Sequence, residues 1–76
     1  MSRADEIADD LASQTMEIIN ATGNDDIVNE VSSALGGYSQ TLEESFMTAI
    51  RVRRAEQRAR SILAAQRKAA GLPDNG

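Results

Sequence analysis

The chain of 76 residues contains no cysteine, no histidine and no tryptophan, and it has one tyrosine and one phenylalanine. The missing cysteines exclude disulfides and thiolate metal sites, and the missing histidines remove the commonest acid–base catalyst and a common metal ligand. So few aromatic side chains cannot form a platform for stacking single-stranded bases. We therefore expect a non-enzymatic protein with no catalytic residues, no cofactor, no metal site and no small-molecule substrate.

Long apolar runs are also missing. No segment approaches the roughly 20 apolar residues that a membrane-spanning helix needs, and the acidic start of the chain lacks the apolar region of a secretory signal. A chain without cysteine is compatible with a reducing compartment. We therefore expect a cytoplasmic protein with no membrane association.

Bulky core-forming side chains are few. Hydrophobic residues make up 41% of the sequence, but 12 of those 31 positions are alanine, and isoleucine, leucine, valine and phenylalanine together number only 15. A chain of 8.2 kDa is expected to bury about 62% of the surface that it exposes when unfolded. Small domains with thin cores usually depend on staples or partners. The composition therefore indicates one small domain that associates with another molecule.

Hydrophobic periodicity predicts an all-α fold, a small three-helix domain with a long, projecting C-terminal helix. The single domain covers residues 1–76, with helices at about 3–22, 25–35 and 42–70 and a frayed tail at 71–76. We expect the first two helices to be antiparallel and joined by a tight turn. The third helix then covers both of them and extends beyond.

Apolar residues at three- and four-residue spacing define the buried faces of the first two helices. In the first helix this stripe comprises Ala4, Ile7, Ala8, Leu11, Thr15, Ile18, Ile19 and Thr22. In the second it comprises Ile27, Val28, Val31 and Leu35. The β-branched residues of the second stripe would also suit a strand, but no second strand is expected to pair with it.

Capping signals set the ends of the helices. Ser2 is the expected N-cap of the first helix, and Gly23 in a left-handed conformation is its expected end. For the third helix, Thr41 and Glu44 have the spacing of a capping box, and Ser39 is an alternative cap two residues earlier. Glycine and proline mark the remaining ends: Gly36, Gly37, Gly71 and Pro73.

The third helix has two different apolar faces. In its first half, one face comprises Leu42, Phe46, Ala49 and Ile50, which we expect to pack on the first two helices. In its second half a face about 120° away, which we call the seam, comprises Val52, Ala55, Ala59, Ile62 and Leu63. Small residues at this spacing suit a close, coiled-coil-like contact with another molecule. Alternatively, the helix breaks near Arg51–Arg54 and its second half folds back on its own chain.

Charge is unevenly distributed along the chain. Residues 1–50 carry a net charge of −9 and residues 51–76 a net charge of +5. The basic side chains of the second part form two ridges that are expected to flank the seam, as charged residues flank a coiled-coil contact. One ridge comprises Arg51, Arg54 and Arg58, and the other Arg53, Arg60 and Arg67.

Three interpretations of these arginines remain open. They could meet the acidic face of the first helix, in the same chain or in another copy; that face comprises Asp5, Glu6, Asp9, Asp10 and Glu17. They could bind nucleic-acid phosphates, although a pI near 4.6 disfavours a polyanionic partner. They could also form a solvated helical face.

These patterns together favour a self-associating helical protein, most simply a dimer, that also binds another protein. The seam would provide the contact, and four arginines would orient it: Arg51, Arg54, Arg58 and Arg60. The alternative function is a nucleic-acid-associated regulator that uses the same basic helix on phosphates.

Overall fold

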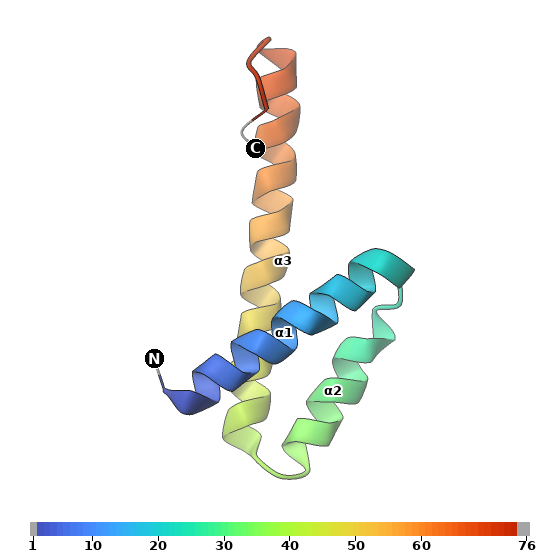
Figure 1. The fold of residues 1–76 in the computed structure, drawn as a ribbon, viewed down its shortest axis with the longest axis vertical. Coiled ribbons are helices and arrows are strands. Elements are labelled where there is room, and N and C mark those ends of the chain that lie inside the picture. The colour runs from blue at the N-terminus through green and yellow to red at the C-terminus, as the bar shows by residue number, and fades with distance from the viewer. Residues whose placement is uncertain (1, 75–76) are drawn as a thin grey trace.

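The computed structural model describes residues 2–74, which form three α-helices: α1 (Arg3–Thr22), α2 (Asp26–Gly36) and α3 (Gln40–Ala69). In Figure 1, α1 crosses the first half of α3, α2 lies to one side of it, and the second half of α3 extends away from both. No strand occurs between residues 2 and 74. The predicted all-α fold with a projecting C-terminal helix is therefore confirmed.

The core forms around the first half of α3. Phe46 and Ile50 are fully buried, and they belong to one cluster with Val28 of α2 and three residues of α1: Ala8, Ala12 and Met16. Leu42 and Ala49 pack against this cluster from α3. The four residues expected on the buried face of the third helix are thus all in or next to the core.

The buried face of α1 differs from the predicted stripe. Ile7 and Ile18 are 39% and 43% exposed, whereas Ala12 and Met16, which the stripe left out, are buried. Ala8, Ala12 and Met16 follow one another at four-residue spacing, the spacing of a packing ridge. Because α1 crosses α3 along this ridge, small side chains at its centre let the two backbones approach, and the larger isoleucines lie at the edges.

The two N-terminal helices run in roughly opposite directions and are joined by a short connection, as expected (Figure 1). From the connection at residues 23–25 they diverge, and each packs mainly on α3 rather than on the other (Figure 1). The helix α3 is therefore the element that holds α1 and α2 in one domain.

The predicted caps of α1 are confirmed. The Oγ atom of Ser2 accepts a hydrogen bond of 3.1 Å from the backbone N–H of Asp5. At the other end Gly23 has a φ of 74°, and its N–H donates to the carbonyl oxygen of Ile19 at 2.7 Å. A left-handed residue here turns the chain from α1 towards α2.

The N-cap of α3 is Ser39, not Thr41. The Oγ atom of Ser39 accepts from the backbone N–H of Leu42 at 3.1 Å, so the cap lies two residues before Thr41 and the helix begins at Gln40. In the first turn of this helix, Glu43 lies next to α2, where its Oε2 accepts a hydrogen bond of 2.8 Å from the hydroxyl of Ser32. The contact between α2 and α3 thus lies in the first turn of a helix whose N-cap could not be decided from sequence alone.

Gly36 lies against this contact, and its backbone is not left-handed. Neither Gly36 nor Gly37 has a positive φ, but a Cβ atom on Gly36 would lie 2.8 Å from Oε1 of Glu43. A larger residue there would displace the carboxylate that Ser32 binds.

A Schellman motif ends α3. Gly71 has a φ of 74°, the N–H of Leu72 donates to the carbonyl oxygen of Arg67 at 2.8 Å, and the N–H of Gly71 donates to that of Lys68 at 3.1 Å. The Nε of Arg67 also donates to the carbonyl oxygen of Pro73 at 2.8 Å. Residues 71–73 thus turn back onto the last helical turn (Figure 1). Of the tail expected to fray, residues 75 and 76 lie outside the described residues.

We expect Gly23→Ala to lower the free energy of unfolding by about 1–2 kcal/mol, because alanine is strained at a positive φ. No atom lies within 4 Å of the added Cβ, so backbone strain is the whole effect. Gly71→Ala is the matched control, since Gly71 has the same φ and equally open surroundings. It lies at the projecting end of α3 and should fray only the last turn. Urea unfolding followed by circular dichroism measures both, and equal losses of stability would contradict this prediction.

Candidate protein-interaction surface

The helix α3 is continuous over 30 residues, from Gln40 to Ala69. The alternative that it breaks near Arg51–Arg54 and folds back is therefore wrong. Its second half makes the molecule elongated, with extents of 50 × 29 × 14 Å. The Cα radius of gyration is 15.1 Å, against about 11 Å for a compact domain of this length.

The seam is uncovered along its whole length. Val52, Ile62 and Leu63 are 61%, 47% and 61% exposed, and Ala55 and Ala59 are exposed as well. At 100° per residue the centre of the seam lies roughly opposite the buried Phe46 and Ile50. The seam therefore faces away from α1 and α2, and neither helix covers it.

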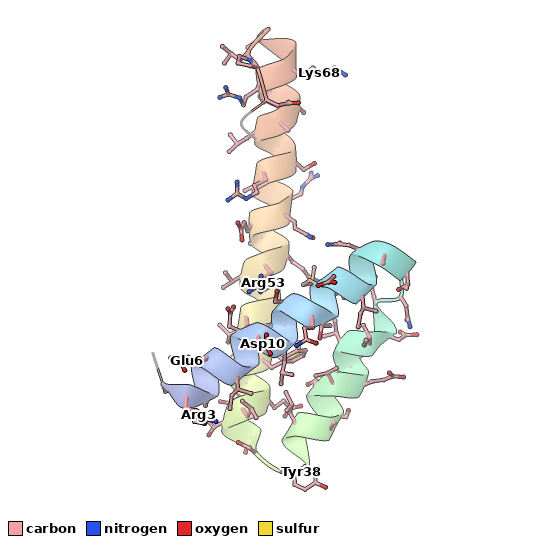
Figure 2. All side chains as sticks on the ribbon, in the orientation of Figure 1. Arg3, Glu6, Asp10, Tyr38, Arg53 and Lys68 are labelled. Carbon is pink, nitrogen blue, oxygen red and sulfur yellow. The ribbon has the colours of Figure 1, made fainter. Side chains whose placement is uncertain are left out.

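Two arginines join the second half of α3 to the rest of the chain. Arg53 forms an ion pair of 2.9 Å with Asp9 of α1. Figure 2 shows Arg53 at the point where α1 passes in front of α3. Arg54 lies 3.6 Å from the carboxylate of Asp25, which precedes α2. The first interpretation, that arginines meet acidic residues of the same chain, is thus observed for Arg53 and the acidic face of the first helix.

The four arginines expected to orient a partner fall into two groups. Arg54 pairs with Asp25, and Arg60 pairs with Glu56 one turn earlier on α3 at 2.9 Å. Arg51 and Arg58 are exposed, and within residues 2–74 neither forms an ion pair. Arg51 and Arg58 are therefore the members of this set that are available to another molecule.

The ridge that contains Arg53 and Arg60 does not flank the seam. Both residues line an open cleft of about 370 Å³ between α1 and α3. Sevenfold spacing keeps a residue on one helical face, and Arg53 and Arg60 follow the buried Phe46 at that spacing. The same spacing could have indicated from sequence that this ridge faces α1. The residues that line the cleft are Ser13, Met16, Glu17, Asn20, Arg53, Glu56, Gln57 and Arg60.

This cleft offers no strong site for a charged ligand. Arg53 and Arg60 contribute two positive charges, and Glu17 and Glu56 contribute two negative ones. Both arginines already bind carboxylates, although the Nε atom of Arg53 is buried without a hydrogen-bond partner. The exposed seam on the other side of α3 is the feature that remains unexplained within one chain.

No protein-family model matches this chain, and no curated protein and no solved structure matches it either. None of the helices within residues 2–74 combines the length and apolar character needed to cross a membrane. The same residues contain no cluster of three acidic, histidine or cysteine side chains that could hold a metal ion. What the arrangement offers is an apolar helical face flanked by arginines, which is suited to docking another helix.

Proposed function

We propose that this protein is a non-enzymatic helical interaction module that self-associates, most simply as a dimer, through the seam. The single observation that carries the proposal is the projection of α3 beyond α1 and α2 with Val52, Ile62 and Leu63 exposed on its free side. Burying apolar surface of this kind is the main driving force of protein association. A second chain would supply the cover that α1 and α2 do not.

The amount of exposed surface supports this proposal. The chain exposes 5607 Å², about 1,100 Å² more than the roughly 4,500 Å² expected for a compact monomer of its mass. A specific protein–protein interface of standard size removes about 800 Å² from each partner. The surplus surface of one chain is therefore large enough for one such interface.

We also propose that the arginines around the seam orient a protein partner. Arg51 and Arg58 are exposed beside the seam, and an arginine side chain can bind a carboxylate through two parallel hydrogen bonds. Charged groups of this kind act mainly on orientation and on association rate. The partner that fits is a protein with carboxylates on its surface.

The proposal is tested by measuring the mass of the protein in solution over a concentration series. We expect sedimentation or light scattering to show a species of twice 8.2 kDa or more that dissociates on dilution. When two chains separate at the seam, each monomer stays folded. The helix content should therefore stay constant through the concentration series. A monomer of 8.2 kDa at every concentration would overturn the proposal.

Nucleic-acid binding is the second candidate function. It is favoured by one observation: Arg3 apart, the basic side chains lie together on α3 from Arg51 onwards. It is disfavoured by the carboxylates that already pair with Arg53, Arg54 and Arg60. Binding of duplex DNA or RNA that weakens steeply with salt would support it. No binding at low salt would dismiss it.

A further inference from the structure

We infer that the free side of α3 pairs with the same side of a second copy in parallel and in register, as a two-stranded coiled coil. This inference rests on the proposed self-association and adds its geometry. The contact surface, which we call the outer face, contains the seam residues except Leu63, which lies at its edge, and continues in both directions. It comprises Thr41, Ser45, Thr48, Val52, Ala55, Ala59, Ile62, Gln66 and Ala69.

The outer face has the regular spacing that a coiled coil needs. Its central apolar residues Val52, Ala55, Ala59 and Ile62 are separated by steps of three, four and three, and the remaining residues, polar apart from Ala69, continue the same steps towards both ends of one unbroken helix. This is the 3.5-residue period of a left-handed supercoil. Eight of the nine residues are exposed, and Ser45 is half-buried. A continuous stripe is therefore open to a second helix along nearly all of α3.

Charge complementarity favours the parallel arrangement. In a parallel pair, residue 51, which directly precedes Val52, faces residue 56 of the other helix. Glu56 pairs with Arg60 of its own chain, but its side chain is 53% exposed. Arg51 of each chain then faces Glu56 of the second copy, so that symmetry creates two further opposite-charge contacts. One heptad further on, Arg58 faces Leu63 of the second copy, whose apolar surface the aliphatic part of an arginine can cover. No like charges face each other across this contact.

The antiparallel arrangement lacks this complementarity. With Ala55 opposite Ala59 of the second copy, the apolar parts overlap, but Arg58 meets Arg58 and Glu56 meets Glu56 across the contact. The helices can also be shifted by one heptad from this register. A shift in one direction places Arg51 opposite Arg58 of the second copy. A shift in the other direction leaves no pair of charged residues across the contact. The parallel arrangement is thus the one in which flanking charges attract.

Gln66 also fits the parallel arrangement. Its position on the outer face is equivalent to that of Val52 and Ala59, so in register it faces Gln66 of the second copy. An amide side chain both donates and accepts hydrogen bonds, so two facing glutamines can satisfy each other. Polar residues at this coiled-coil position are known to specify register at some cost in stability.

The rest of the molecule leaves room for a parallel pair. The residues of α3 that contact α1 and α2, among them Phe46, Ile50 and Arg53, lie on its other face, so two chains can approach along their outer faces with α1 and α2 pointing outwards. Arg53, Arg54 and Arg60 also lie on the α1 and α2 side. Their distance from the equivalent residues of the second copy exceeds the Debye length of about 8 Å at physiological salt, so repulsion between them is largely screened.

Disulfide trapping distinguishes the two arrangements, and the chain is suited to it because it contains no cysteine of its own. In the parallel pair, residue 48 lies beside residue 48 of the second copy, so Thr48→Cys should cross-link with itself in a glutathione redox buffer. In the antiparallel pair residue 48 lies opposite residue 66, and the two copies of residue 48 are about 27 Å apart along the axis. That distance is far beyond the reach of a disulfide.

Three samples make this comparison complete: Thr48→Cys alone, an equimolar mixture of Thr48→Cys with Gln66→Cys, and Ala64→Cys. Ala64 is exposed on the side of α3 away from the seam, so Ala64→Cys is the control for random collision and should remain uncross-linked. Cross-linking of Thr48→Cys alone supports the parallel pair. Cross-links between residues 48 and 66 in the mixture, or a dimer in which none forms, would overturn it and leave self-association standing.

Charge exchange provides an independent test. We expect Arg51→Glu and Glu56→Arg each to raise the dimer dissociation constant about two- to thirtyfold, the range that two exposed ion pairs span. The double variant Arg51→Glu/Glu56→Arg should return to within about twofold of the original value, because the pairs re-form with reversed sign. Lys68→Glu, away from the outer face, is the control for Arg51→Glu, because it makes the same change of charge.

Two results of the charge exchange would contradict the inference. Single exchanges without effect in a chain that dimerises would overturn the parallel register alone. An unmodified chain that is monomeric at every concentration would overturn the proposed self-association and the register with it.

Discussion

Phe46→Ala is expected to lower the free energy of unfolding by about 3–5 kcal/mol, the range for removing a buried aromatic ring. Phe46 is fully buried and is, with Ile50, the largest side chain that the core encloses. The small side chains of Ala8 and Ala12 lie in the same cluster and cannot move far enough to fill the space. The lost contacts and the cavity therefore both destabilise the folded state.

The size of the chain makes this loss severe. A domain of 76 residues has a total stability of about 4–11 kcal/mol. Phe46→Ala therefore removes between about a quarter and all of this stability, and we expect a much lower melting temperature and a lower urea midpoint. Thermal and urea unfolding followed by circular dichroism measure the effect.

Leu63→Ala is the matched control for this prediction. It also replaces a large apolar side chain of α3 by alanine, but Leu63 is 61% exposed and belongs to the seam. At concentrations where the protein is monomeric, we expect its stability to change by less than about 0.5 kcal/mol, as at most surface positions. A loss as large as that of Phe46→Ala would show that the end of α3 is packed within its own chain.

Ala59→Glu is expected to disperse the proposed dimer while the three helices remain folded. Ala59 is exposed in one chain, and glutamate is a good helix former, so the monomer has little reason to unfold. Between two chains, the same position is central to the seam. A dimer would have to bury two carboxylates against apolar residues, which costs several kcal/mol. We expect a dissociation constant at least about a hundredfold higher.

The control for Ala59→Glu is Ala64→Glu. The two variants make the same chemical change on the same helix, but Ala64 is exposed on the side away from the seam. Sedimentation at matched concentrations should show a monomer for Ala59→Glu and the original assembly for Ala64→Glu. If Ala59→Glu retained the assembly, another surface would have to be the interface. If it lost its helical signal, the seam would be packed inside the chain.

Much of this fold could be predicted because its signals are local. The apolar period of each helix, the serine that precedes α1 and the glycine that ends it are all contained in short stretches of sequence. The projection of α3 was also predictable, since a helix without internal glycine or proline outruns two shorter ones. The apolar residues of α3 move to a different face near Val52, and this change indicated where α1 and α2 stop covering the helix.

The remainder depends on contacts between helices. Periodicity counts hydrophobic residues without regard to size, so it placed Ile7 and Ile18 in the core. The crossing of α1 and α3 instead requires the small Ala8 and Ala12 at its centre. The choice of Ser39 over Thr41 as a cap could not be read locally either, because both hydroxyls suit the role. The use of the seam by a second chain remains a prediction.

One consequence for folding follows from the position of α3 between the other two helices. Because α1 and α2 pack mainly on α3 and little on each other, they have no shared core of their own. A segment that lacks Phe46 and Ile50 therefore has nothing on which to collapse. Folding should engage all three helices in one cooperative transition.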